Sequence, residues 1–408
     1  MPLLPPLFFP LDDELGLGRG TWSPAVEQAM IRLGTWLPFE RVPRELAALV
    51  GVTVGRETVR RRTEAAGAAL VAAEEAAVEE LGRTWPAPPV AAGWYQVSVD
   101  GAMVPLVHGE WAEVKTLAVG RLERQRQAAG QWSVRATALS YFSRLAEAEE
   151  FRRLAWVETH RRGVTLAPQV CAVGDGALWC QRFYDWHCPD AVRILDWPHA
   201  AAYLTAAARA TFGAGTPQAA TWLDTTLDTL VHGTPEAVFA ALRALPEAEA
   251  TAPTAAAEQV QASVQYLEAR REQLAYAQFR AAGYPLGSGI VESANKLVVE
   301  ARLKGSGMHW ARANVNPLVA LRAAVCSERW AAAWAQIEQQ QRAERAQARA
   351  QQRAARQATA GPPVAPAPPP CPAPPEAPPA PVRPKTMENG RPTRAHPWKH
   401  KFLQHQTS

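Results

Sequence analysis

The chain has 408 residues, of which 48% are hydrophobic and 20% charged, and its formal net charge is +4 at pH 7. This length accommodates two or three domains with a sizeable core, and the composition is typical of a globular protein. No apolar run reaches the ~18 residues that a membrane helix needs, and the apolar start lacks the basic residues of a secretory signal. We therefore expect a cytoplasmic protein without a membrane partner.

The first 83 residues are expected to form a helical domain, beginning with a helix around 24–36. The segment 43–67, PRELAALVGVTVGRETVRRRTEAAG, has apolar residues at helical spacing on both sides of Gly51, which outlines a helix-turn-helix. Its second helix can enter the major groove of DNA and carries four arginines: Arg56, Arg60, Arg61 and Arg62. A plain helical hairpin with a solvated arginine face fits the pattern equally well. An Ala/Glu-rich helix to about Gly82 should follow.

Beyond a Pro-rich linker at 84–93, the pattern changes to that of a sheet. Alternating apolar residues predict three strands, followed by an amphipathic helix, a buried strand and a strand that leads into a helix: 94–106, 112–123, 132–143, 144–162, 168–179 and 191–204. This order predicts an α/β fold with a mixed sheet.

The remaining chain divides by composition into three parts. Residues 205–282 are Ala-rich and predict a helical insertion with breaks at 213–217 and 233–235. Residues 283–355 return to the core through a Gly-rich loop and a helix. Residues 356–408 form a Pro/Ala linker and a basic tail, which we expect to be disordered. The tail either contacts the DNA backbone or is inert.

Five scattered cysteines without a CxxC pair argue against a disulfide framework. A zinc site formed by Cys180, His187 and Cys188 is an alternative, but reduced thiols near a core are favoured.

Three carboxylates stand out by position. Asp100 and Asp175 each end an apolar strand and precede a glycine, and Glu292 lies in the first turns of a helix that follows Gly-Ser-Gly at 287–289. Two carboxylates on neighbouring strand ends repel each other unless a divalent cation neutralises them. Oxygen ligands favour Mg²⁺ or Mn²⁺, and a pair of such ions supports phosphodiester chemistry. Each residue alone has a simpler interpretation, as a turn or as a solvated helix face.

Four segments together resemble bacterial insertion-sequence transposases of the DDE type, in the ISKra-like group related to the Mutator-like superfamily. The segments are VSVDGAMVPL, AVGDGALW, ILDWPHAAAYL and YPLGSGIVESANKLVVEARLKGSGMHW. The terminal HPWKH adds to the resemblance, which covers roughly residues 40–335 and that motif.

The resemblance implies a ribonuclease-H-like core at 94–204 and 283–355, interrupted by the helical insertion at 205–282 and preceded by a DNA-binding domain at 1–83. It places the catalytic and metal-binding triad on Asp100, Asp175 and Glu292, with two Mg²⁺ or Mn²⁺ ions. It assigns the Asp-x-x-His motif to Asp196 and His199, either as active-site support or as a structural pair at the sheet edge.

The activity that the resemblance implies is metal-dependent hydrolysis at transposon ends, followed by strand transfer to target DNA. The protein would then be nucleoid-associated and at least dimeric on double-stranded DNA. Side chains on and beyond the Glu292 helix either contact DNA phosphates or are simply solvated: Asn295, Lys296, Arg302, Lys304 and His309. Two alternatives are a nuclease of the same fold that does not join DNA, and a non-catalytic DNA-binding regulator derived from a transposase.

Overall fold

The computed structural model describes residues 22–89, 93–126, 132–245, 255–359, 385–389, 391–393 and 396. The described residues up to Ala348 form one compact unit, and those from Arg349 onward form a second. The second unit contains a short hairpin of strands β6 (Met387–Glu388) and β7 (Arg391–Pro392). The Pro/Ala linker and most of the basic tail, expected to be disordered, lie outside the described residues.

The first unit begins with α2 (Pro24–Trp36), α3 (Val42–Val50) and α4 (Arg56–Thr84). The Ser23 side chain accepts a hydrogen bond from the Val26 amide and caps α2, because the first amides of a helix have no partner within it. The α3 helix ends at Gly51, whose φ of 68° favours glycine. Helix α4 continues without a break to Thr84, so the Ala/Glu-rich helix expected as a separate element is part of it.

A mixed sheet forms the centre of this unit. Within the described residues it has five strands in the order β3-β2-β1-β4-β5. The strands are β1 (Trp94–Pro105), β2 (Trp111–Arg126), β3 (Trp132–Arg144), β4 (Gln169–Gly174) and β5 (Val192–Leu195). β2 is antiparallel to both β1 and β3, β4 is parallel to β1, and β5 is parallel to β4. The expected α/β fold with a mixed sheet is therefore confirmed.

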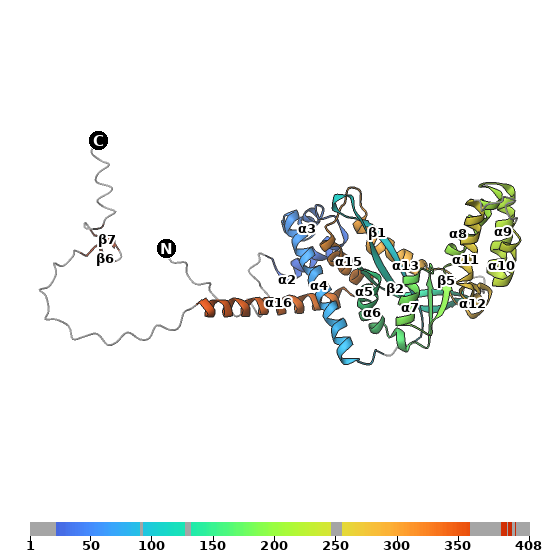
Figure 1. Ribbon diagram of the computed structural model, residues 1–408. Helices are drawn as coiled ribbons and strands as arrows, with labels where there is room; N and C mark the ends of the chain where they lie inside the picture. Colours follow the sequence, from blue (N-terminus) through green and yellow to red (C-terminus); the bar gives the residue numbers. More distant parts are fainter. Residues whose placement is uncertain are drawn as a thin grey trace, which may run out of the picture. The chain divides into compact units, whose positions relative to one another are not determined.

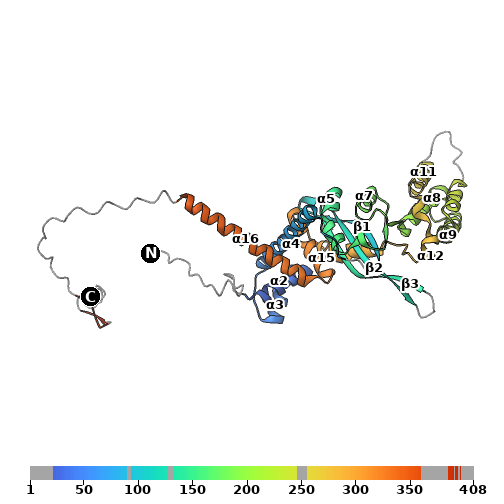
Figure 2. The same cartoon turned by 90° about the horizontal axis from the view of Figure 1, so that it is seen from below.

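Helices cover both faces of the sheet (Figures 1 and 2). One face packs against helices that include the buried Phe151 and Phe183: α5 (Ala148–Leu154), α6 (Trp156–Arg161) and α7 (Leu178–His187). The other face packs against helices that include the buried Val291 and Leu318: α13 (Gly289–Ala294), the π-helical segment η4 (Asn295–Glu300), α14 (Ala301–Leu303) and α15 (Arg312–Cys326). The single helix expected at 144–162 is two helices, α5 and α6.

The N-terminal helices share a hydrophobic core with this second layer. Ile31 of α2 and Leu70 of α4 belong to one buried cluster with Leu321 of α15 and Ile337 of α16 (Trp330–Thr359). They therefore belong to the same compact unit as the sheet.

Residues between β5 and α13 form the helical insertion, which packs against β4 and β5 through a cluster that includes Val173, Ile194 and Leu267. Its helices are α8 (Trp197–Phe212), α9 (Pro217–His232), α10 (Pro235–Arg243), α11 (Ala255–Glu268) and α12 (Tyr276–Ala282). The breaks expected at 213–217 and 233–235 coincide with the gaps between α8, α9 and α10.

Among the described helices, none combines the length and apolar character needed to cross a membrane.

Candidate active site

Asp100, within β1, and Asp175, directly after β4, occupy matching positions beyond the paired part of two neighbouring parallel strands. The last paired residues of β1 and β4 are Val97 and Ala172, and each aspartate follows three residues later. Between these points the strands separate, and the Tyr184 hydroxyl bridges them. It accepts a hydrogen bond from the Val99 amide and donates one to the Val173 carbonyl, both at 3.2 Å. Open α/β sheets commonly bind ligands beyond the carboxyl ends of strands that diverge in this way.

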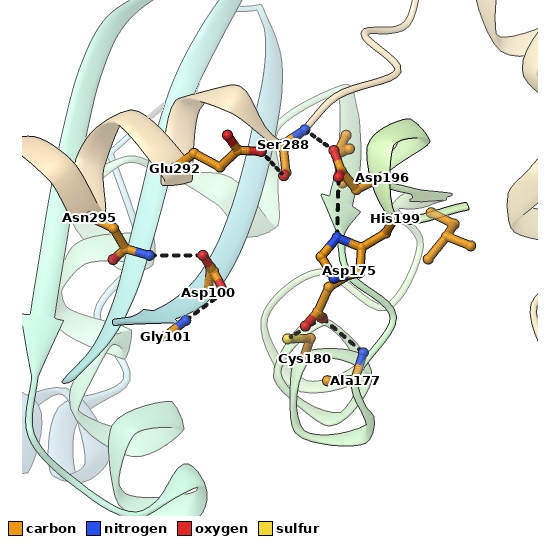
Figure 3. Close-up of polar contacts among 12 residues, drawn as sticks. Asp100, Gly101, Asp175, Ala177, Cys180, Asp196, His199, Ser288, Glu292 and Asn295 are labelled. Atoms are coloured by element: carbon orange, nitrogen blue, oxygen red, sulfur yellow. Dashed lines mark hydrogen bonds and ion pairs between the residues drawn. The ribbon is translucent and has the colours of Figure 1, made fainter. Parts of the chain in front are cut away.

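Both oxygens of the half-buried Asp100 carboxylate accept hydrogen bonds from the protein. The Gly101 amide donates to Oδ1 at 2.7 Å, and Asn295 Nδ2 donates to Oδ2 at 2.8 Å (Figure 3). Burial raises the pKa of Asp100, and the negative charge of Asp175 raises it further.

Asp175 lies on a loop that the helical insertion holds in place. Its Oδ1 accepts from the Ala177 amide at 2.9 Å and from the Cys180 thiol at 3.3 Å. The insertion donates to main-chain carbonyls of this loop: Tyr266 to Asp175, and Arg270 to Gly176 at 2.8 and 3.0 Å. These contacts fix the loop through its backbone and leave the Asp175 carboxylate at the sheet end.

Glu292 is exposed in the first turn of α13, and its carboxylate lies beside the Ser288 hydroxyl at 3.5 Å (Figure 3). The loop before α13 is tied to the sheet at two points. Ser288 donates its amide to Asp196 Oδ1 at 2.7 Å, and Gln96 of β1 donates to the Gly287 carbonyl at 3.0 Å. The Gly-Ser-Gly entry therefore brings the Glu292 helix onto the face of the sheet at β1, the central strand that carries Asp100.

Asp196 and His199 form a pair at the start of α8. Asp196 is buried, and His199 Nδ1 lies 3.5 Å from its Oδ2. Burial alone would raise the pKa of Asp196, but the hydrogen bonds from His199 and the Ser288 amide outweigh it and leave that pKa below its usual value. The hydrogen bond to Asp196 raises the pKa of His199, and the charges of Asp175 and Asp100 add to this effect. His199 therefore lies within electrostatic reach of both candidate carboxylates.

The donor set has the chemistry of a site for a hard divalent cation. Carboxylate oxygens are the ligands that Mg²⁺ and Mn²⁺ prefer, and a cation would relieve the repulsion between Asp100 and Asp175. In the part of the chain that the structure describes, however, no three His, Cys, Asp or Glu side chains are grouped to hold a metal ion. Asp100, Asp175 and Glu292 each accept hydrogen bonds from the protein, and their carboxylates keep further lone pairs that a cation could use.

The residues expected to contact DNA on and after the Glu292 helix divide into exposed and buried ones. Lys296 and Lys304 are exposed, and Lys304 pairs with Glu300 at 2.6 Å. Arg302 is only 2% exposed and donates to the Gly34 carbonyl, so a phosphate contact at the surface is wrong for this residue. Asn295 is 6% exposed and binds Asp100 instead of a phosphate.

Three of the four arginines at the start of α4 have acidic partners. Arg60 pairs with Glu57 at 2.5 Å and with Glu64 at 2.7 Å. Arg62 pairs with Glu27 at 3.1 Å, and Arg61 lies 4.0 Å from Glu57. No ion pair of Arg56 occurs among the described residues, and this arginine is exposed. A role of this face in DNA recognition stays a prediction.

The alternative zinc site has no support in the geometry. Both ring nitrogens of the buried His187 are engaged at 2.9 Å, by the Thr159 hydroxyl and the Arg152 carbonyl. Burial lowers the pKa of His187 to about 3, and burial raises the pKa of the Cys188 thiol. This histidine is a hydrogen-bonded core residue.

Comparison of the sequence with protein-family models and with curated proteins found no match. The candidate site therefore depends on its own geometry and chemistry.

Sequence reasoning missed the residues that hold the carboxylates in position. Tyr184, Tyr266 and Arg270 have no motif around them, and their contacts join segments far apart in the chain. Sequence reasoning also missed the π-helical turn that begins at Asn295, a rare form found frequently at functional sites.

Proposed function

We propose that this chain is a DDE-type DNA transposase, which cleaves phosphodiester bonds at transposon ends and joins them to target DNA. One observation carries the proposal: Asp100 and Asp175 occupy matching positions where β1 and β4 separate, and the Glu292 helix is tied to Asp100 through Asn295 and to Asp196, which follows β5, through the Ser288 amide. The strand order, three antiparallel strands beside two parallel ones, supports a ribonuclease-H-like core.

In this proposal Asp100, Asp175 and Glu292 hold the divalent cations, two Mg²⁺ or Mn²⁺ ions. Such ions, when bound, polarise a phosphodiester and stabilise the leaving oxygen. Asn295 orients Asp100, and Asp196 fixes the loop that delivers Glu292. His199 is half exposed, and its raised pKa favours a cationic ring suited to a phosphate oxygen beside the carboxylates.

Double-stranded DNA is the proposed substrate, and the first unit offers two elements to contact it. The exposed Arg56 and Arg61 lie at the start of α4, and the exposed Lys296 lies one turn after Glu292. Since two transposon ends must be joined in one event, a dimer or larger assembly on DNA is part of the proposal.

The test measures cleavage of the element's own terminal DNA in Mg²⁺ or Mn²⁺. It compares the wild type with three variants: Asp100→Asn, Asp175→Asn and Glu292→Gln. Each substitution should abolish cleavage and leave end binding largely intact, because it removes a charge without changing side-chain size. Glu300→Gln, at the end of the adjoining segment η4, is the matched control, since Glu300 pairs with Lys304. Cleavage at the wild-type rate by any of the three variants would remove that residue from the triad.

Two further outcomes separate the proposal from its alternatives. Pre-cleaved ends that are not joined to target DNA, despite normal cleavage, would favour a nuclease of the same fold. Tight end binding by the wild type, without cleavage in either metal, would favour a non-catalytic regulator.

A further inference from the structure

The π-helical segment η4 is held from outside by two buried arginines. Arg322 of α15 donates from Nε to the Val298 carbonyl at 3.3 Å and from Nη2 to the Leu297 carbonyl. Arg302, in the helix α14 that follows the segment, donates from Nε and Nη2 to the Gly34 carbonyl at 3.4 and 3.3 Å. Arg322 therefore binds η4 directly, and Arg302 fixes the end of η4 to α2.

Neither arginine forms an ion pair with any described acidic residue, although Arg302 is 2% exposed and Arg322 is 1% exposed. A buried cation without a counter-ion is costly, and an apolar side chain would fill the same space at less cost. The two guanidinium groups donate hydrogen bonds to main-chain carbonyls. An apolar side chain has no donors and could not make these bonds. Their placement therefore indicates a positioning role for this segment.

Both arginines meet the last turn of α2. The Arg302 donors reach the Gly34 carbonyl, and the Arg322 guanidinium lies over the ring of Trp36, 4.2 Å from its centroid. This turn packs tightly against α4, because a Cβ on Gly34 would lie 2.4 Å from the Thr63 hydroxyl oxygen. The end of α2 thus offers one carbonyl and one aromatic ring to the residues that hold η4.

The first residue of η4 is Asn295, whose Nδ2 donates to Asp100 at 2.8 Å. Continuous contacts therefore run from the last turn of α2, through Arg302 and Arg322, to η4 and then to Asp100. The N-terminal helices, expected to recognise DNA, lie at one end of these contacts and a candidate catalytic carboxylate lies at the other.

We propose that the last turn of α2 acts through Arg302 and Arg322 to fix the π-helical segment, and that this segment positions Asp100 through Asn295. Arg302, Arg322 and Asn295 are then positioning residues of the candidate active site. The part that concerns cation binding rests on the proposed function, whereas the mechanical link does not. A DNA end that shifts α2 would change the orientation of Asp100, so recognition and chemistry would be coupled within one chain.

The first experiment tests the mechanical link by hydrogen–deuterium exchange of the full chain, without metal or DNA. Arg322→Lys keeps the charge but loses the fork of donors, and should increase amide exchange in residues 295–303. Arg144→Lys is the control for a buried arginine elsewhere, because Arg144 is also 1% exposed but pairs with Glu74 and stacks 4.5 Å from the centroid of Phe142, which belongs to the core on the other face of the sheet. Unchanged exchange in residues 295–303, or an equal increase in both variants, would overturn the proposal. Should Arg322→Lys fail to fold, Trp36→Leu at a 40% exposed site gives the same readout.

The second experiment measures Mn²⁺ affinity by electron paramagnetic resonance, without DNA. Arg322→Lys and Asn295→Leu should each lower the affinity ~10-fold, as expected for residues that orient a metal ligand. The double variant should lose little more than either single one, because both act through one contact.

Additive losses in the double variant, or a normal affinity in Arg322→Lys, would refute the link to Asp100. A wild-type chain that binds no Mn²⁺ would instead refute the proposed function, and the exchange experiment would still decide the link between α2 and η4.

Discussion

Asp196 joins the start of α8 to the loop that precedes Glu292, and its removal should destabilise the protein measurably. The side chain is 2% exposed and accepts the Ser288 amide at 2.7 Å. Asp196→Ala leaves that buried amide without an acceptor, and a hydrogen bond to a charged group contributes roughly 1.5–3 kcal/mol. We expect the free energy of unfolding to fall by about 2–3 kcal/mol. Asp196→Asn keeps an acceptor and loses only the charge, so its loss should be about 1 kcal/mol.

The pH dependence of this effect has a defined sign. The folded-state pKa of Asp196 is lowered, so its contribution is complete above the unfolded value of about 3.9 and is lost as the pH falls through the folded value. The folded-state pKa of His199 is raised, so its contribution is complete below about 6.5 and is lost as the pH rises through the folded value. The difference in stability between wild type and Asp196→Asn should therefore be largest from about pH 4 to pH 6.5.

Urea unfolding followed by circular dichroism, repeated from pH 4 to pH 8, measures both quantities. NMR titration of the His199 ring adds a direct check, since its pKa should fall in Asp196→Asn. A loss below about 0.5 kcal/mol in Asp196→Ala would show that the Ser288 amide finds another acceptor. A difference that does not change with pH would refute the pairing of Asp196 with His199.

Two further predictions concern the N-terminal helices. Gly67→Ala should lower the stability by about 1–3 kcal/mol in thermal unfolding, because its Cβ would lie 2.2 Å from the Pro317 carbonyl oxygen. Gly82→Ala in the same helix is the control, because its Cβ would meet no atom nearer than 3.9 Å, and it should be neutral or stabilise the protein by roughly 0.5–1 kcal/mol. Equal losses of stability in the Gly67 and Gly82 variants would refute the close contact of α4 with α15. Arg61→Glu, alone or with Arg60→Glu, should weaken binding to end DNA, and each lost phosphate contact should reduce the slope of log K against log salt by about 0.9. An unchanged slope in a gel-shift titration would exclude both arginines from the interface.

Most of the fold was predictable from local patterns. Alternation of apolar and polar residues located β1, β2 and β3, and glycine and proline located the gaps between α8, α9 and α10. Asp175 could be placed at a strand end because β4 stops at Gly174, whereas the strand end expected at Asp100 is wrong, because β1 continues along β2 to Pro105. The matching register of the two aspartates was not predictable, since it depends on which residues of β1 and β4 pair.

The positions of Arg302 and Asn295 could not be predicted in the same way. A helical wheel assumes about 100° per residue, and a π-helical turn adds a residue and rotates every later side chain. The segment NKLVVE carries no glycine or proline that would reveal the change. The partners of Arg302 come from α2, more than 250 residues earlier, and no local pattern encodes a contact at that separation.

The insertion holds the Asp175 loop through its backbone, and this has a consequence for mutated copies of the gene. Tyr266 and Arg270 hold main-chain carbonyls, so a substitution of the Asp175 side chain leaves those contacts in place. Asparagine at this position could still accept the Ala177 amide. On the proposed function, a copy that has lost this one charge would keep its shape and its grip on DNA. The inactive protein would therefore act as a dominant inhibitor of intact copies in the same cell. Mutation of some copies would then limit the transposition of the others.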